Sequence, residues 1–251
     1  AITSSEYVNY QGATGYWRHP HAVTLDDGRV LVVAGKQERY TTSWTRALDG
    51  TWSDVLMYNP GAAFTVADGP YPCLVKLPTG RVLCFFWREL SATSYQVMQF
   101  YTDDAGATWT MGQRSCLAAA IDTTTNTPKR LRAAYLNGQV LLLAHIEDTA
   151  NFDELWQYAS VDKGCSFTLV DTLDASPYGF PEVVNAGGVL VVAVITNNAS
   201  APWNTPKVAR LASAHDLLSS ATWVEVSGKG PVEWASPSAD MITVPANFTN
   251  G

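Results

Sequence analysis

Three arginines lie in predicted strands, where a permanent cation could point at a ligand. Arg18 begins an apolar, strand-like run, and Arg130 and Arg132 lie two residues apart in another. Residues two apart share one face of a strand, so we expect Arg130 and Arg132 to line the same surface. A planar guanidinium binds a carboxylate through two parallel hydrogen bonds. For Arg18 the sequence leaves a second role open, as a buried structural ion pair or a charge at the rim of the fold.

Acid–base chemistry has two candidates, Glu38 and Glu182. Residues 36–50, which follow the first predicted hairpin, contain only Glu38 and Asp49 as acids, and Asp49 belongs to a turn motif described below. Glu182 lies on a later predicted strand. Glycoside hydrolysis needs two such groups on opposite sides of the scissile bond, and the sequence does not supply a recognisable pair. No catalytic residue is therefore assigned beyond these two candidates.

Composition narrows the class of protein and of partner. With 47% hydrophobic and 16% charged residues among 251, the chain is globular, and its net charge of −7 argues against nucleic acid and anionic membrane surfaces. No apolar run approaches the roughly 18 residues that span a bilayer, so we expect no membrane insertion. Four cysteines and four histidines without a C-x-x-C pair predict no metal site, and no cofactor motif is present.

The elements that must position these residues repeat along the chain. A hairpin of two apolar runs around a glycine-containing turn occurs four times, with turn glycines spaced by 52, 58 and 50 residues at Gly28, Gly80, Gly138 and Gly188. A period near 50 residues is typical of a propeller blade made of four antiparallel strands. The second run of each hairpin is continuously apolar, as expected for a strand covered on both faces.

A second, more polar hairpin follows in each unit. Residues 102–109 read Thr-x-Asp-x-Gly-x-Thr-Trp, and residues 160–167 read Ser-x-Asp-x-Gly-x-Ser-Phe. The aspartate can accept hydrogen bonds from turn N–H groups, the glycine supplies a left-handed residue, and we expect the aromatic ring to fill the core of its blade. A shortened form stands at 49–52. The structural residues predicted in these turns are Asp104, Gly106, Trp109, Asp162, Gly164, Phe167, Asp49 and Trp52.

These turns resemble the Asp-box, or BNR repeat, of sialidase-like (neuraminidase) β-propellers. The resemblance extends to residues 17–20, Trp-Arg-His-Pro, which are similar to the Phe/Tyr-Arg-Ile-Pro motif that opens the first blade in that family. It implies that Arg18 is the first of three arginines that clamp a substrate carboxylate, with Arg39 as a second pocket arginine. Trp17, Arg130 and Arg132 would line the same funnel. Ten residues before the other turn glycines stand Pro70, Pro128 and Tyr178, so no other repeat has an arginine at the place of Arg18.

The resemblance also predicts the organisation of the chain. We expect one all-β domain, residues 1–251, with blades at about 18–59, 70–117, 128–173 and 178–227 and the start of a fifth at 233–251. Since the family has six blades, which at this period need roughly 330 residues, we interpret the chain as part of a longer one. The alternative is a five-bladed ring that residues 1–17 complete by strand exchange.

Cys73 and Cys84 flank the turn at 77–81. If Gly80 is the left-handed residue of a three-residue bulged turn, Leu77 pairs with Arg81 and the two thiols lie on opposite faces of the sheet. A two-residue turn would place them directly opposite each other. The bulged turn is favoured, and with it free, buried cysteines.

The predicted function is glycan recognition or attachment on a secreted, cell-surface or virion structure, such as a phage tail or spike. Low charge density and loops rich in Thr, Ala and Asn suit that role, as would a homo-oligomer or larger assembly. The partners would be glycans, including sialylated or other acidic sugars. The alternatives are a sialidase-like exo-glycoside hydrolase in which Arg18 binds the substrate carboxylate, and a purely structural scaffold.

Overall fold

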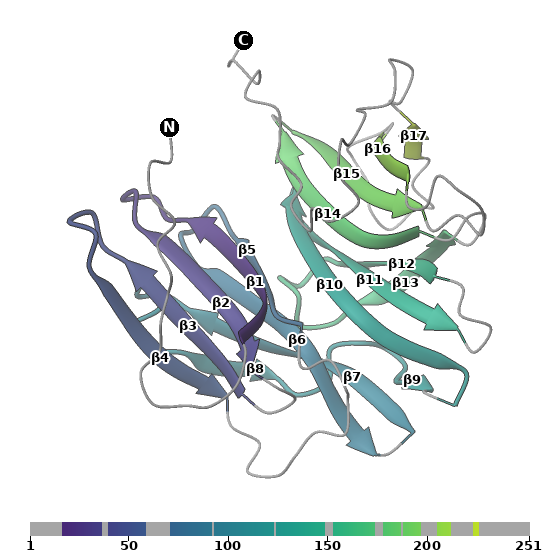
Figure 1. Ribbon diagram of the computed structural model, residues 1–251, viewed down its shortest axis with the longest axis horizontal. Coiled ribbons are helices and arrows are strands. Elements are labelled where there is room, and N and C mark those ends of the chain that lie inside the picture. The colour runs from purple at the N-terminus through teal and green to yellow at the C-terminus, as the bar shows by residue number, and fades with distance from the viewer. Residues whose placement is uncertain are drawn as a thin grey trace.

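The computed structural model describes residues 17–36, 40–58, 71–91, 93–122, 124–148, 153–173, 178–186, 188–196, 205–211 and 223–225. Within these ranges the chain forms seventeen strands and no helix (Figure 1). The same ranges therefore contain no helix that is long and apolar enough to cross a membrane. The expected start of a fifth blade lies outside the described residues.

Four antiparallel sheets follow one another along the chain, and we call them blades one to four. Blade one is β1 (Trp17–Thr24), β2 (Val30–Lys36), β3 (Tyr40–Arg46) and β4 (Trp52–Tyr58). Blade two is β5 (Cys73–Lys76), β6 (Val82–Ser91), β7 (Ser94–Thr102) and β8 (Thr110–Gln113), with the short β9 (Ile121–Asp122) paired to β7. Blade three is β10 (Asn126–Leu136), β11 (Gln139–Asp148), β12 (Asp153–Ser160) and β13 (Thr168–Leu173). Blade four is β14 (Tyr178–Ala186), β15 (Val189–Thr196), β16 (Thr205–Leu211) and β17 (Trp223–Glu225).

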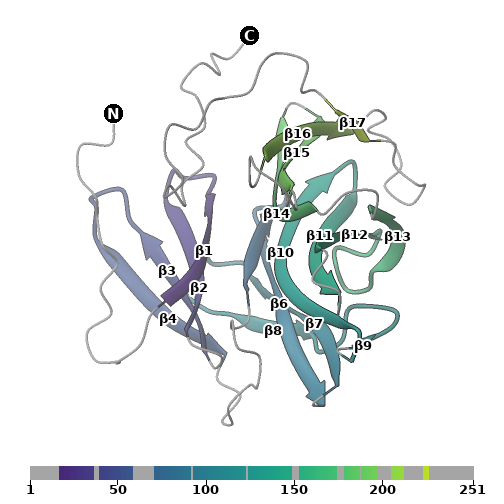
Figure 2. The same ribbon diagram turned by 45° about the vertical axis from the view of Figure 1, so that its right-hand side comes forward.

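The strands of each blade are hydrogen-bonded in chain order, so the first strand is always at one edge. These first strands contact one another in sequence: β1 meets β5, β5 meets β10, and β10 meets β14. Figures 1 and 2 show the blades fanning outward from this row of first strands. The first strands therefore surround a common axis, and side chains from all four can meet there.

The inner hairpins use two kinds of turn. In blades one and two, Leu25 and Leu77 each donate an N–H to an arginine carbonyl four residues on, at 2.9 and 2.8 Å, across a three-residue turn whose glycine has a φ of +86°. In blade three, Leu136 pairs with Gln139 and only two residues with positive φ separate them. Blade four also has a two-residue turn, between Ala186 and Val189. The match between turn length and register is what fixes which side chains reach the axis.

The predicted bulged turn at Gly80 is confirmed, and so is its consequence for the cysteines. Cys73 pairs with Phe85 and Cys84 with Leu74, which places the two thiols in different hydrophobic clusters. All four cysteines are free, and three of them are buried. Burial raises the pKa of Cys73 to about 12, so this thiol is protonated and unreactive at neutral pH.

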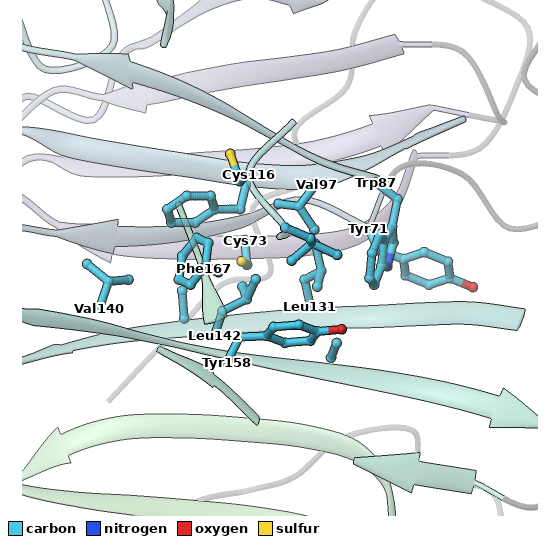
Figure 3. Close-up of a cluster of buried hydrophobic side chains, with 14 of the residues drawn as sticks. Tyr71, Cys73, Trp87, Val97, Cys116, Leu131, Val140, Leu142, Tyr158 and Phe167 are labelled. Carbon is cyan, nitrogen blue, oxygen red and sulfur yellow. The ribbon is translucent and has the colours of Figure 1, made fainter. Parts of the chain in front are cut away.

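The hydrophobic core is divided into layers between consecutive blades. One cluster joins blades one and two, a second joins blades two and three, and a third joins blades three and four. In the middle layer, Phe167 of blade three packs edge-on against Phe85 of blade two with ring centroids 5.4 Å apart. Figure 3 shows Phe167 among other buried side chains of this layer, including Leu142 and Tyr158. Residues 82–87 of β6 and 140–146 of β11 are buried throughout, as expected for strands covered on both faces. Each buried Val, Leu, Ile or Phe side chain among them contributes about 1.5–3 kcal/mol through removal from water.

We call the turn between the third and fourth strands of a blade its outer turn. In blade two, the Asp104 carboxylate accepts the Thr108 N–H at 2.8 Å and the Thr108 hydroxyl at 2.6 Å, while the Thr102 hydroxyl donates to it at 2.7 Å. The Thr102 oxygen also accepts the Gly106 N–H at 2.9 Å. Blade three repeats these contacts around Asp162 with distances of 2.9, 2.6, 2.6 and 2.8 Å. The predicted roles of aspartate and glycine in these two turns are therefore confirmed.

The aromatic residues of these two turns also reach the preceding blade. Trp109 of blade two donates its indole N–H to the Ser43 hydroxyl of blade one at 2.8 Å, and Phe167 lies in the cluster shared by blades two and three. Each ring fills the interface with the preceding blade, because the outer turn folds back over that blade. Gln99 of β7 strengthens the second interface by donating to the Lys163 carbonyl at 2.9 Å.

The outer turn of blade one is reduced. Asp49 accepts the N–H and hydroxyl of Thr51, at 2.9 and 2.7 Å, and its turn glycine has a φ of +89°. Position 47 is alanine, so the hydroxyl that donates to the carboxylate in blades two and three has no counterpart. Trp52 begins β4 directly after this turn. The shortened motif thus gives a shortened hydrogen-bond network.

Replacing Asp104 by alanine is expected to lower the free energy of unfolding by about 1 kcal/mol, since several exposed hydrogen bonds are lost together. Burial raises the pKa of Asp104, but hydrogen bonds from Thr108 and Thr102 outweigh it and leave the pKa below 3.8. This contribution to stability is present above pH 3.8 and is lost as the pH falls through the lower pKa of the folded state. Urea unfolding measures the change, and Asp49→Ala, with fewer bonds, should lose less; equal losses would contradict the network account.

Candidate functional site

The four first strands and the turns beside them line an open cavity of about 720 Å³ on their common axis, which we call the axial channel. Much of its wall is apolar and comes from β1, β5, β10 and β14, including Ala22, Leu74, Ala133 and Val183. His21, Asp26, Lys76, Glu182 and Asn185 bring polar groups to the same wall. This volume lies in the range of about 300–1,000 Å³ that is common for small-molecule sites, and an apolar wall with a few polar groups is their usual chemistry.

One residue from each first strand occupies the same level of the axis. His21, Cys73, Arg132 and Glu182 each lie four residues before the residue that closes the inner hairpin of their blade. We call this set the axial ring. Because the blades repeat, four unrelated side chains are brought to equivalent positions, and one of them is a base, one an acid and one a permanent cation.

A bulge precedes the axial ring in three blades. The register of β1 shifts between Arg18 and His21, that of β10 between Pro128 and Leu131, and that of β14 between Gly179 and Glu182. A bulge bends a strand and re-aims the side chains beside it. Arg130 lies within the second of these bulges, so the regular alternation that predicted a shared face for Arg130 and Arg132 is interrupted.

Arg132 and Glu182 form an ion pair between the neighbouring first strands of blades three and four. Arg132 donates to Glu182 Oε1 from Nε at 2.7 Å and from Nη2 at 2.5 Å, and its Nη1 donates to the Leu131 carbonyl at 2.8 Å. The arginine side chain is 5% exposed and the glutamate side chain 41% exposed. The buried Arg132 cation is therefore neutralised, and the Glu182 carboxylate is the member of the pair that is accessible from the axial channel.

His21 is held in one neutral tautomer. Its Nδ1 accepts the N–H of Leu74 at 3.1 Å, so this nitrogen carries no proton and Nε2 carries it. Burial first, and the nearby Arg132 second, lower the pKa of His21 to about 4, although Glu182 opposes them. At neutral pH the axial ring therefore presents an uncharged N–H donor rather than a second cation.

The remaining polar groups of the channel wall are also paired. Lys76 of β5 contacts Asp26 of the blade-one turn at 2.6 Å. Asn185 donates to the Tyr135 carbonyl at 2.8 Å and accepts the Gly188 N–H at 2.9 Å. Within the described parts of the chain, no group of three or more His, Cys, Asp or Glu residues is arranged to hold a metal ion.

Comparison with known proteins identifies the fold. No protein-family model matches the chain, and no curated protein sequence matches it. Among solved structures, the Hadza microbial sialidase Hz136 matches with a TM-score of 0.60 at 16% identity, over 83% of this chain and 46% of that one. The Fusarium graminearum α-L-arabinofuranosidase Arb93A matches with a TM-score of 0.60 at 13% identity, over 83% and 66%. The chain has the sialidase-like β-propeller fold. An endo-arabinase from Bacteroides thetaiotaomicron also matches, with a TM-score of 0.58 at 13% identity over 83% and 78%.

On this sialidase-like propeller, the predicted site residues fall into three groups. Arg132 and Glu182, predicted separately as a substrate-binding residue and a catalytic candidate, are brought into contact. Trp17 and Arg18 pair through their backbones with Lys36 and Gly35, at the end of β1 far from its turn, while the placement of their side chains is not described. Glu38 and Arg39 lie outside the described residues.

Sequence reasoning missed His21 and Cys73 as members of the axial ring, although a signal for them exists. Proline directly precedes the ring residue in three repeats of the propeller, as Pro20, Pro72 and Pro181. Proline cannot donate to a sheet ladder and is tolerated at bulges and strand starts. A proline at the same place in three of the four repeats would therefore have indicated where the first strands depart from regular pairing.

The protonation state of His21 predicts how the free energy of unfolding of the propeller changes with pH. The folded pKa of about 4 is below the ordinary value of 6.5, so between these values the unfolded chain binds the proton first and stability falls as the pH falls. The free energy of unfolding should drop by at most about 3 kcal/mol through this group. Chemical denaturation at pH 7, 5.5 and 4.5 measures it. His21→Asn keeps an acceptor for Leu74 and does not titrate, so an unchanged pH slope in this variant would sink the assignment.

Proposed function

We propose that this chain is a glycan-recognition module that binds its sugar in the axial channel. The observation that carries the proposal is the Arg132–Glu182 pair, which holds a partly exposed carboxylate at the wall of a cavity of about 720 Å³. A carboxylate fixed by two arginine N–H groups is a strong, preorganised acceptor for ligand hydroxyls. The apolar wall beside it would contact the C–H face of a sugar ring.

The comparisons support the same class of ligand. The matched structures are named as a sialidase, an arabinofuranosidase and an endo-arabinase, all of them proteins that act on carbohydrates. We further propose that the outer turns of blades two and three are Asp-boxes, which the repeated carboxylate geometry supports. We also propose that the chain acts outside the cell or on a virion, where attachment to glycans would be useful; immunogold labelling of the source cells or particles tests this location.

A glycan array tests whether the chain binds sugars, and a pair of variants tests whether it binds them in the axial channel. Ala22 lies on the channel wall and is exposed, whereas Thr24 is exposed on the same strand without lining the channel. We expect Ala22→Trp to fill the channel and weaken binding at least about tenfold, and Thr24→Trp to bind as wild type does. Equal affinity in both variants would place the sugar elsewhere. Absence of any glycan binding would favour a purely structural scaffold.

Glycoside hydrolysis is the second candidate, favoured by the enzymes named among the matched structures. It requires an acid–base group and a nucleophile around one sugar, and the resemblance assigns Arg18 the role of binding a substrate carboxylate. Fluorogenic sialosides and arabinofuranosides should then be turned over by wild type, with sialoside turnover lost in Arg18→Ala. Zero turnover in both proteins, or equal sialoside rates in both, would eliminate the sialidase role of Arg18.

A further inference from the structure

The charges around the axial channel cancel. Arg132 is neutralised by Glu182 at 2.5–2.7 Å, and Lys76 is neutralised by Asp26 at 2.6 Å. Further along β10, Lys129 contacts Glu147 at 2.9 Å. His21 adds no charge, because its Nδ1 accepts a backbone N–H and its pKa is about 4. Among the channel-lining side chains that the structure describes, no cation is therefore left uncompensated.

An acidic ligand would meet two carboxylates on this wall. Its own carboxylate would have to displace Glu182 from Arg132 or Asp26 from Lys76, or lie beside a like charge. Displacing Glu182 from Arg132 is unfavourable for two reasons. The Arg132 side chain is only 5% exposed, and Glu182 is part of the same folded chain, so it stays beside Arg132. The arrangement therefore discriminates against anions even though two cations are close to the cavity.

An uncharged sugar would find partners that fit a hydroxyl group. Both bonds from Arg132 end on Glu182 Oε1, which leaves the lone pairs of Oε2 for a ligand O–H. The neutral tautomer of His21 carries an N–H donor at Nε2 on the same axial ring. A sugar hydroxyl both donates and accepts, so an acceptor and a donor at one level of the channel can bind it together.

From this geometry we infer that the axial channel selects uncharged sugars over acidic ones. The inference rests on the proposed glycan-binding function and names the ligand class of the same site. It departs from the sequence-based expectation that the arginines serve to bind the carboxylate of an acidic sugar. The sequence could not show this, because the carboxylates that neutralise Arg132 and Lys76 come from other repeats, about 50 residues away in the chain.

Matched pairs of sugars test the selection. Isothermal titration compares galactose with galacturonate, which has a carboxylate in place of the C6 hydroxymethyl group, and lactose with sialyllactose, which carries an added sialic acid residue. We expect the uncharged member to bind at least tenfold more tightly to wild type. Tighter binding of the acidic member would overturn the inference while leaving the glycan-binding proposal intact. No binding of either class, with a glycan array that is also negative, would overturn the proposed function and this inference with it.

Two variants should shift the preference by releasing a cation. Asp26→Asn frees Lys76 and is expected to raise affinity for the acidic member at least threefold. Asp27→Asn is the matched control, because Asp27 is its neighbour, pairs with Arg29 at 2.7 Å and does not line the channel. Glu182→Gln frees Arg132 and should raise acidic binding more strongly; if this variant does not fold, Asp26→Asn decides. An unchanged preference in Asp26→Asn would contradict the charge argument.

Discussion

Replacing Gly164 by alanine is expected to lower the free energy of unfolding by about 4 kcal/mol. Gly164 has a φ of +80°, which strains any other residue. A Cβ there would also overlap the ring of Phe85, which is fully buried and packed against Phe167. Strain in the backbone and overpacking of a buried interface each cost about 1–3 kcal/mol, and here both apply.

The matched control is Gly138→Ala. Gly138 has a φ of +86°, but a Cβ at this position meets nothing within 4 Å. We expect it to lose only the conformational contribution, about 1 kcal/mol. Guanidinium denaturation of both variants separates the two contributions. Similar losses in the two variants would show that Phe85 can move, and that the interface between blades two and three is less tightly packed than its buried rings imply.

The second large effect is an asymmetry within the Arg132–Glu182 pair. Glu182→Gln should lower the free energy of unfolding by about 3 kcal/mol, because it leaves a buried cation without a counter-charge. Arg132→Met should cost less, about 1 kcal/mol, since the carboxylate it leaves is 41% exposed and can be hydrated from the channel.

A double-mutant cycle tests this asymmetry. In the variant that combines both changes, no charge is left without its partner, so its stability should exceed that of Glu182→Gln alone. Thermal melts followed by circular dichroism at pH 7 are sufficient for the ranking. A greater loss from Arg132→Met than from Glu182→Gln would mean that packing of the arginine stem, rather than its charge, dominates the pair.

The fold could be predicted from the sequence because its determinants are local. The turn glycines, the apolar second strands and the Asp-x-Gly spacing of the outer turns each lie within a few residues, and each reappears in the structure. The interface role of Trp109 and Phe167 could not be predicted in this way. Their partners, such as Ser43 and Phe85, belong to the preceding blade.

The residues of the site could be predicted less well, because the turn glycine does not lie at the same distance from the hairpin-closing residue in every repeat. Blades one and two have three-residue turns and blades three and four have two-residue turns, so an alignment on the turn glycines is displaced by one residue between the two halves. Counting from the hairpin-closing residues instead places Lys129, rather than Pro128, at the position that corresponds to Arg18. Lys129 is a cation paired with Glu147, so a positive charge at this place is not confined to the first repeat.

The contacts that the outer turns of blades two and three make with the preceding blade bear on how such a chain can evolve. The side chains of Phe85 and Gln99 leave no room for a Cβ at Gly164, and those of Leu31 and Thr45 leave none at Gly106. A blade copied or recombined by itself would carry a turn fitted to a neighbour it no longer has. The unit that can be duplicated or exchanged intact is therefore the outer hairpin of one blade together with the middle strands of its predecessor. Covariation between relatives should accordingly link positions in adjacent repeats more strongly than positions within one repeat.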